Sequence, residues 1–314
     1  MAKTSSGSFI SKQELHSLSQ TVNESMSGDE FMITNHFKHP WTFFIVATIG
    51  PWLAWFGAAW LSWQAGSSTL VLFAISLLAG IGMCIPALTA RSLIKRDLIL
   101  LQDLRIRLTL TLRSWRYVLL GLMIMMGSIL FAQFISLGLG YSADQFQLAH
   151  SASFSAGVLV GWVPLLLAPV IEEIGWHGYG TDALRRSMNL FWGSIIFAIF
   201  WALWHIPLAY IKDYYQANLA EAGVLYTLNF LISLIPFVII MNWLYFRSGR
   251  NIWVAVAFHL SANVSNEIFD TNPDSKIIQT IILAVLMLAI VLRDRKMFFE
   301  LHKMELDIIK KATI

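Results

Sequence analysis

Eight long apolar stretches constrain what this chain can fold into. They lie at about residues 41–63, 70–90, 117–141, 155–176, 190–211, 224–246, 252–270 and 277–292. A helix of about 20 apolar residues spans the hydrocarbon core of a bilayer. Only 13% of the 314 residues are charged, against about 25% in soluble domains, which excludes a disordered chain, a nucleic-acid-binding module and an ordinary soluble enzyme. The sequence therefore predicts an all-α, polytopic membrane helix bundle with about eight transmembrane helices.

The positive charges are distributed unevenly between the loops. Of the 22 Lys and Arg residues, all but Lys212 and Lys276 lie in the N-terminal tail, in every second loop or in the C-terminal tail. Cytoplasmic segments carry the excess of Lys and Arg. We therefore expect a multi-pass protein of the plasma membrane (the inner membrane in a bacterium) with both termini cytoplasmic. The tail 1–40 lacks a charged-then-apolar signal pattern, so we expect no cleaved signal peptide.

A basic connector at 91–116 interrupts the three N-terminal spans, which together occupy 41–141. Its apolar residues recur every three or four positions among Arg and Lys. This pattern is typical of an amphipathic helix on the inner leaflet that contacts anionic lipid. A solvated basic connector also fits, because charge runs often serve only topology. Residues 105–112 alternate with period two, which is compatible with an extended strand.

Several ionisable or amide side chains fall inside the predicted spans. The fourth span contains Glu172 and Glu173, the fifth contains His205, and the seventh contains His259 and Asn263. Such groups are costly in a membrane, so each is a candidate functional residue. With these span boundaries Glu172 lies near the inner end of its span whereas His205 lies deep in the next. A shared site therefore requires either that the fourth span sinks further into the membrane or that the fifth span starts later.

Helical spacing distinguishes the two glutamates. Adjacent residues point about 100° apart on a helix, so Glu172 and Glu173 cannot face the same point. His177 follows Glu173 by four positions, which is the favourable order for an acid–base pair. We therefore expect His177 to support Glu173, and Glu172 to be free to face a cavity. His259 and Asn263, also four apart, share one face of their helix.

This set of groups suits peptide hydrolysis. Glu172 with His205 would activate a water, while His259 with Asn263 would donate hydrogen bonds to the oxyanion. The same residues offer a second mechanism, in which His205, His259 and Glu172 hold zinc. Spacing does not separate the two mechanisms, and a structural polar network or a transporter remains an alternative. The chain has neither an HExxH zinc motif nor a GxSG serine motif.

Three motifs follow one another on three spans: EEIGWH begins at Glu172, WALWH ends at His205, and HLSAN begins at His259. They resemble the EExxxR, FxxxH and HxxxN motifs of the CPBP family of intramembrane endoproteases. That family includes the CAAX prenyl endopeptidase and bacterial proteins linked to bacteriocin processing or self-immunity. Two positions depart from the pattern, because His177 replaces Arg and Trp201 replaces Phe.

The resemblance implies a protease core at 155–270. Hydropathy and charge predict a last span and a cytoplasmic tail after it, at 277–314. It implies an intramembrane endopeptidase that cleaves a membrane-associated protein or peptide. Glu172 would be the catalytic carboxylate, supported by Glu173 and His177, with His205, His259 and Asn263 as the other functional positions. The family has been described both as metalloproteases and as glutamate-dependent enzymes, and we favour the metal-free mechanism here while zinc stays open. A non-catalytic immunity or scaffold protein of the same family is the alternative, and the oligomeric state is open.

Overall fold

Helices form nearly all of the structure. The computed structural model describes residues 33, 35–64, 68–150, 153–159 and 161–300, and these contain no β-strand. Six of the described segments are long and apolar enough to cross a bilayer. They are α2 (Pro40–Ser62), α3 (Thr69–Ile94), α5 (Leu112–Gly138), α8 (Leu190–Trp204) continued by the 3-10 turn η3 (Ile206–Tyr210), α10 (Val224–Arg247) and α12 (Pro273–Arg293). The all-α membrane bundle predicted from hydropathy is confirmed.

The other two predicted spans differ from their expected bounds. Helix α6 (Trp162–Gly175) has 14 residues and runs through a π-helical turn, η2 (Trp176–Gly180), into α7 (Thr181–Arg185). Helix α11 (Ile252–Glu267) has 16 residues, most of them buried. A hydropathy window cannot locate these ends, because α6 continues into polar helical turns and the ends of α11 are set by its packing inside the bundle.

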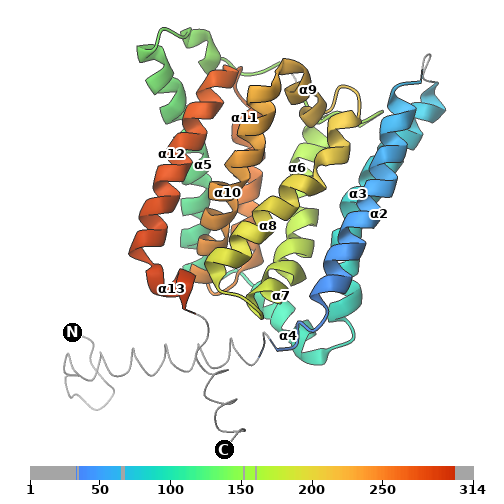
Figure 1. Ribbon diagram of the computed structural model, residues 1–314, viewed down its shortest axis with the longest axis vertical. Helices are drawn as coiled ribbons and strands as arrows, with labels where there is room; N and C mark the ends of the chain where they lie inside the picture. The colour runs from blue at the N-terminus through green and yellow to red at the C-terminus, as the bar shows by residue number, and fades with distance from the viewer. Residues whose placement is uncertain (1–32, 34, 65–67, 151–152, 160, 301–314) are drawn as a thin grey trace, which may run out of the picture.

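The helices pack in pairs around α6 and α11. Helix α2 packs on α3, α8 on α10, and α5 on α11, while α6 contacts both α3 and α11 (Figure 1). Gly175 permits the close approach of α6 to α3, since a Cβ there would lie 2.9 Å from the Cβ of Pro86. This approach fixes the helix that carries the two adjacent glutamates.

Large apolar side chains cover the outside of the long helices. Leu53, Phe73, Met123, Ile232 and Val285 are all more than half exposed, although each belongs to a different helix. A water-soluble protein rarely exposes apolar surface on every side. This apolar surface is compatible with direct contact with the lipid tails of a bilayer.

The connector at 91–116 differs from the prediction. Helix α3 extends to Ile94, a ten-residue helix α4 (Leu98–Arg107) follows, and α5 begins at Leu112. No strand forms over 105–112. Arg107 is buried and not directed to lipid, while Lys95 and Arg105 are exposed.

Arg107 is buried because it belongs to a network of four charged side chains. Its Nε lies 2.7 Å from Asp103 and its Nη1 3.1 Å from Asp182. Arg250 completes the network with 2.9 Å to Asp103 and 3.0 Å to Asp182. Burial alone would raise the pKa of Asp182, but Arg250 and Arg107 outweigh it and hold that pKa below its usual range. The network joins α4, α7 and the turn between α10 and α11.

The bundle has two different ends. Helices α4, α7 and α13 (Arg295–Phe299) lie at one end, which also carries the charged network (Figure 1). Helix α9 (Tyr215–Ala222) and the start of α12 lie at the opposite end. A short 3-10 turn, η1 (Ala143–Phe146), follows α5. Most of the predicted tail 1–40, and residues 301–314 of the predicted C-terminal tail, lie outside the described residues.

Candidate active site

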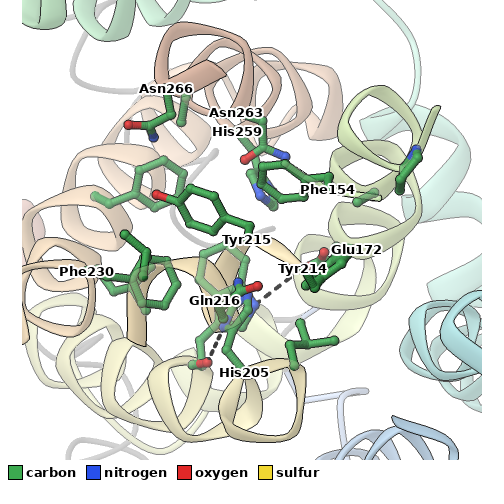
Figure 2. Close-up of a pocket in the computed structure, with 18 of the residues that line it drawn as sticks. Phe154, Glu172, His205, Tyr214, Tyr215, Gln216, Phe230, His259, Asn263 and Asn266 are labelled. Atoms are coloured by element: carbon green, nitrogen blue, oxygen red, sulfur yellow. Dashed lines mark hydrogen bonds between the residues drawn. The ribbon is translucent and has the colours of Figure 1, made fainter. Parts of the chain in front are cut away.

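A cavity of about 270 Å³ lies inside the bundle, lined by residues of α2, α3, α5, α6, α8, α9, α10, α11 and α12. Glu172, His205, His259 and Asn263 all line it (Figure 2). The structure therefore brings together four side chains that the sequence spreads over 92 positions, from three separate helical segments. A cavity of this size holds several water molecules and part of a peptide.

Glu172 presents its carboxylate to this cavity. The side chain is 6% exposed and projects from the last turn of α6. One oxygen, Oε2, accepts hydrogen bonds from the indole N–H of Trp176 and from that of Trp201, both at 3.3 Å. The other oxygen, Oε1, has no hydrogen-bond partner among the described residues. Two donors thus fix the carboxylate while one oxygen is available for a water or a substrate.

Glu173 points elsewhere and is fully buried. Its Oε2 accepts a hydrogen bond from Nδ1 of His177, and its Oε1 accepts one from Nδ1 of His259 at 2.7 Å. Glu173 does not line the cavity. The two adjacent carboxylates thus take different roles in the geometry, one facing the cavity and the other joining two histidines.

His177 lies between two hydrogen-bond acceptors. Its Nε2 is 2.9 Å from Oδ1 of Asn242, and the amide nitrogen of Asn242 donates to Ser194 at 2.8 Å. The Ser194 hydroxyl in turn donates to the carbonyl of Leu190, which fixes the orientation of the Asn242 amide. Both ring nitrogens of His177 therefore need a proton, so the ring fits this position as an imidazolium.

His259 reaches the cavity from the middle of α11. Since its Nδ1 donates to Glu173, its Nε2 is the nitrogen that remains for a ligand. Its ring packs edge-on against Trp201, with the ring centroids 5.1 Å apart. One turn later, Asn263 donates from Nδ2 to the carbonyl of Leu165 at 3.3 Å, which leaves the second amide proton. Both side chains have a donor to offer a substrate oxygen when His259 is protonated.

His205 ends α8, where the chain turns into η3. Its Nδ1 lies 2.6 Å from the carbonyl oxygen of Trp201, so this nitrogen carries the proton. In the neutral ring Nε2 is then an acceptor. The ring sits among Trp204 and Phe230, each edge-on to it. His205 is therefore oriented by its own helix and offers a lone pair.

The difference in depth expected from the sequence disappears in the structure. Because α6 continues through η2 to Arg185, Glu172 lies 13 residues, or about 20 Å, before the end of the helical segment. His205 lies at a comparable distance, about 22 Å from Leu190 at the start of α8. The long helical segment after Glu172 lets the two residues face the same cavity.

Sequence reasoning missed the two indole groups that hold Glu172. Trp176 lies between the glutamate pair and His177, and in the sequence Trp201 stands out only as an aromatic replacement for Phe. The available signal was their spacing, since Trp176 follows Glu172 by four positions and Trp201 precedes His205 by four. Phe cannot donate a hydrogen bond, so the replacement at position 201 adds a donor to the site.

The two histidines resemble metal ligands in how they are held, but the donor set as a whole does not match a metal site. His205 and His259 each have one nitrogen held by a backbone carbonyl or a carboxylate, which is how metal-bound histidines are usually oriented. However, no group of three His, Cys, Asp or Glu side chains among the described residues lies close enough to share an ion. As placed, Glu172, His205 and His259 do not form a zinc site.

Comparison with known proteins identifies a family for the part of the chain that contains these residues. The family model of Rce1-like type II CAAX prenyl endopeptidases matches residues 153–265. CAAX prenyl protease 2 of Methanococcus maripaludis is 33% identical over 277 residues, covering 86% of this chain and 99% of that protein. Lysostaphin resistance protein A of Staphylococcus epidermidis is 27% identical over 119 residues, covering 38% of this chain and 28% of that protein. The protein of that name from Staphylococcus haemolyticus is 26% identical over 119 residues, covering 38% of this chain and 30% of its own length.

Proposed function

Because the chain belongs to the family of CAAX prenyl endopeptidases, and is thus an intramembrane endopeptidase of that kind, we propose that Glu172 is its general base. One observation carries this assignment. Glu172 is the single Asp or Glu among the described residues that line the cavity, and it faces the same space as two histidines and Asn263. Glu173 does not line the cavity, and each of its oxygens accepts a hydrogen bond from a histidine.

In the first step Glu172 removes a proton from a water molecule. The hydroxide attacks the carbonyl carbon of the scissile peptide bond, and the carbonyl oxygen becomes an oxyanion. His205 orients the water, because its unprotonated Nε2 accepts a hydrogen bond from it. The two indole groups on Oε2 keep Glu172 pointed at the water while Oε1 takes the proton.

The oxyanion is stabilised by donors from α11. His259, protonated and held by Glu173, donates from Nε2, and Asn263 donates its second amide proton. Glu172 then delivers its proton to the leaving nitrogen, the C–N bond breaks, and a carboxylic acid and an amine result. Every proton is accounted for by these residues and one water.

The substrate class follows from the membrane and from the relative. A membrane-associated peptide or protein reaches an active site that lies within the bundle, and the apolar side chains of α3 and α6 form one cavity wall. The archaeal relative's name describes a CAAX prenyl protease. A prenylated peptide with a CAAX sequence is therefore the substrate to test first.

The test uses purified protein in lipid nanodiscs and a quenched fluorogenic farnesylated CAAX peptide. Glu172→Gln should lower the rate by at least about 100-fold, as expected for loss of about 3 kcal/mol of transition-state stabilisation. Glu221→Gln, on the exposed part of α9, is the matched control and should cleave normally. A Glu172→Gln protein that retains more than a tenth of the wild-type rate would remove Glu172 from this role.

Metal dependence is tested on the same protein. With a glutamate-activated water, the purified active enzyme contains less than stoichiometric zinc, and chelation leaves its rate unchanged. One zinc per chain, together with loss of activity on chelation and recovery on zinc return, would replace this mechanism with a metal-dependent one.

A further inference from the structure

The cavity continues beyond the proposed catalytic residues toward the end of the bundle that carries α9. There it is lined by polar side chains: Gln216 in the first turn of α9, Asn229 in α10, Asn266 in the last turn of α11 and Lys276 in the first turn of α12. Figure 2 shows Asn266 and Gln216 among the cavity-lining side chains. None of these four has a part in the hydrolytic steps above.

The three amides of this region lack partners within the described residues. Gln216 is only 7% exposed, yet its Oε1 has no hydrogen-bond partner there. The side-chain amides of Asn229 and Asn266 likewise form no hydrogen bond with any described residue. Buried amides are normally hydrogen-bonded, so a polar occupant with its own donors and acceptors, such as a peptide backbone, would satisfy them.

Lys276 adds a positive charge to this region. It is the single Lys or Arg among the described cavity-lining residues. Its Nζ donates to the carbonyl of Asn266 at 3.0 Å and lies 5.9 Å from the centroid of the Tyr215 ring. An ammonium has three donors, and no described carboxylate lies within ion-pair distance of this one. The nearby Glu267 is instead held by the backbone N–H and hydroxyl of Ser153, both at 2.7 Å.

The position of Lys276 in its helix is unusual on electrostatic grounds. It lies in the first turn of α12, where the helix macrodipole is positive and a cation is unfavourable. The same turn carries Asp274, which Tyr141 and Tyr226 hold by hydrogen bonds, so the ammonium, which forms no ion pair with a described carboxylate, is the group that favours a further anion. A carboxylate is the anion that a peptide carries at its C-terminus.

We propose that Lys276 is a specificity-determining residue that binds the free C-terminal carboxylate of the substrate peptide. The backbone of the same peptide contacts Gln216 and Asn266. The inference rests on the proposed function, because it places that carboxylate relative to the proposed catalytic residues. Asn266 follows His259 by seven positions, or about 10 Å along α11. An extended peptide covers that distance with about three residues. A peptide whose C-terminal carboxylate binds Lys276 therefore has a peptide bond close to His259.

The experiment first measures binding without turnover. A Glu172→Gln protein in nanodiscs of phosphatidylcholine is titrated with one farnesylated CAAX peptide, prepared with a C-terminal acid or a C-terminal amide. The acid should bind about tenfold more tightly than the amide, as expected for a charge-assisted hydrogen bond. Adding Lys276→Met should reduce acid binding to the level of the amide, whereas Lys276→Arg should keep the preference. Lys212→Met, which removes an exposed lysine packed on Trp63, is the matched control and should change nothing.

The outcomes separate this inference from the proposed function. Equal binding of acid and amide, or a preference that survives in Lys276→Met, would overturn the role of Lys276 even if the wild type cleaves peptide. A preference lost in Lys276→Met with no cleavage by the wild type would support Lys276 and contradict the proposed function. If Lys276→Met does not purify as a monodisperse protein, Lys276→Gln takes its place under the same criteria.

A final experiment tests whether the phosphate of an anionic lipid, and not the peptide carboxylate, binds Lys276. The titration is repeated in nanodiscs that contain phosphatidylglycerol. The acid preference should persist there. If phosphatidylglycerol abolishes it, a lipid phosphate and not the peptide terminus is the ligand of Lys276, and the inference fails.

Discussion

At the scale of single residues, the site depends on two indole N–H groups that hold one oxygen of Glu172. Both bonds are long, at 3.3 Å, so each makes a modest contribution. Their common target is Oε2, which leaves Oε1 for the water. The arrangement couples the second family motif to the first, since Trp201 lies on α8 and Glu172 on α6.

The first residue-scale prediction concerns this donor. Trp201→Phe should lower kcat about threefold to tenfold with little change in KM, because one weak hydrogen bond to the base is lost. Trp204→Phe is the matched control: its indole donates to the carbonyl of Ala47 and not to Glu172. Steady-state kinetics on a fluorogenic peptide decide the matter, and equal effects of the two replacements would show that Trp201 acts only through packing.

The second concerns His177, where the family pattern has Arg. Two acceptors, Glu173 and Asn242, require both ring nitrogens to be protonated, although the nearby Arg107 opposes the charge. Activity should therefore depend on both of these hydrogen bonds. His177→Arg, which stays charged, should extend activity to higher pH.

The comparison variant is His177→Ala, which removes the imidazole that holds Glu173. It should lower the rate at every pH, but by less than Glu172→Gln does, because the general base is still present. The measurement is a pH–rate profile of each purified protein. Profiles of one shape for wild type, His177→Arg and His177→Ala would argue that the imidazolium has no part in catalysis.

At the scale of helices, the charged network fixes α7 and therefore the helical segment that carries the glutamates. Arg107 also donates to the carbonyls of His177 and Gly178 in the π-helical turn. A π-helical turn interrupts the regular hydrogen-bond ladder, and such turns often occur at functional sites. Arg107 thus stabilises a turn next to the glutamate pair.

A stability prediction follows from the lowered pKa of Asp182. A carboxyl whose folded pKa lies below its unfolded value, about 3.9, stabilises the fold above that value and loses the contribution as pH falls through the folded pKa. Asp182→Asn should therefore destabilise the protein at pH 7 by about 3 kcal/mol or more, as for a broken buried ion pair. The deficit should shrink toward acidic pH.

Thermal unfolding in detergent between pH 3 and pH 7 measures this effect. Asp213→Asn is the control, because Asp213 is exposed and its left-handed backbone, with φ of 62°, suits Asn as well as Asp. A deficit for Asp182→Asn that does not vary with pH would contradict the ionic explanation.

The helices also show which structural features can be predicted from the sequence and which cannot. Hydropathy located the long helices because apolar length is a local property. It misjudged α6, because this helix continues through η2 and α7 past the apolar stretch. It also misjudged the connector, because the partners of Arg107 in η2 and α7 lie 70 to 75 positions away. Motif spacing selected the cavity-facing residues, but the indole donors and Lys276 depend on contacts that no local pattern encodes.

At the scale of the whole molecule, the basic residues and the cavity's polar extension lie toward opposite ends. The charge distribution favours a cytoplasmic position for the end with α4, α7 and α13. The end with α9 and Lys276 then lies on the other side. The orientation of the bundle therefore also fixes the side toward which the cavity extends.

Cysteine labelling in intact cells measures the orientation. In a Cys84→Ser background, a membrane-impermeant maleimide should label Gln147→Cys and not Arg105→Cys, both of which are exposed positions. Labelling after permeabilisation confirms that Arg105→Cys is accessible. Labelling of Arg105→Cys alone in intact cells would reverse the orientation.

The π-helical turn determines how the protein responds to the deletion of a residue. Compared with an α-helix, it contains one additional residue, and each residue rotates the following helix by about 100°. Asp182 therefore faces Arg107 and Arg250 only because that residue is present. Loss of one position there, such as Gly178, would rewind the segment into a regular helix and turn Asp182 away, leaving two buried arginines with one acid. A deletion of a single codon between the glutamate pair and Asp182 should therefore break this charged network even though it removes none of the four charged side chains.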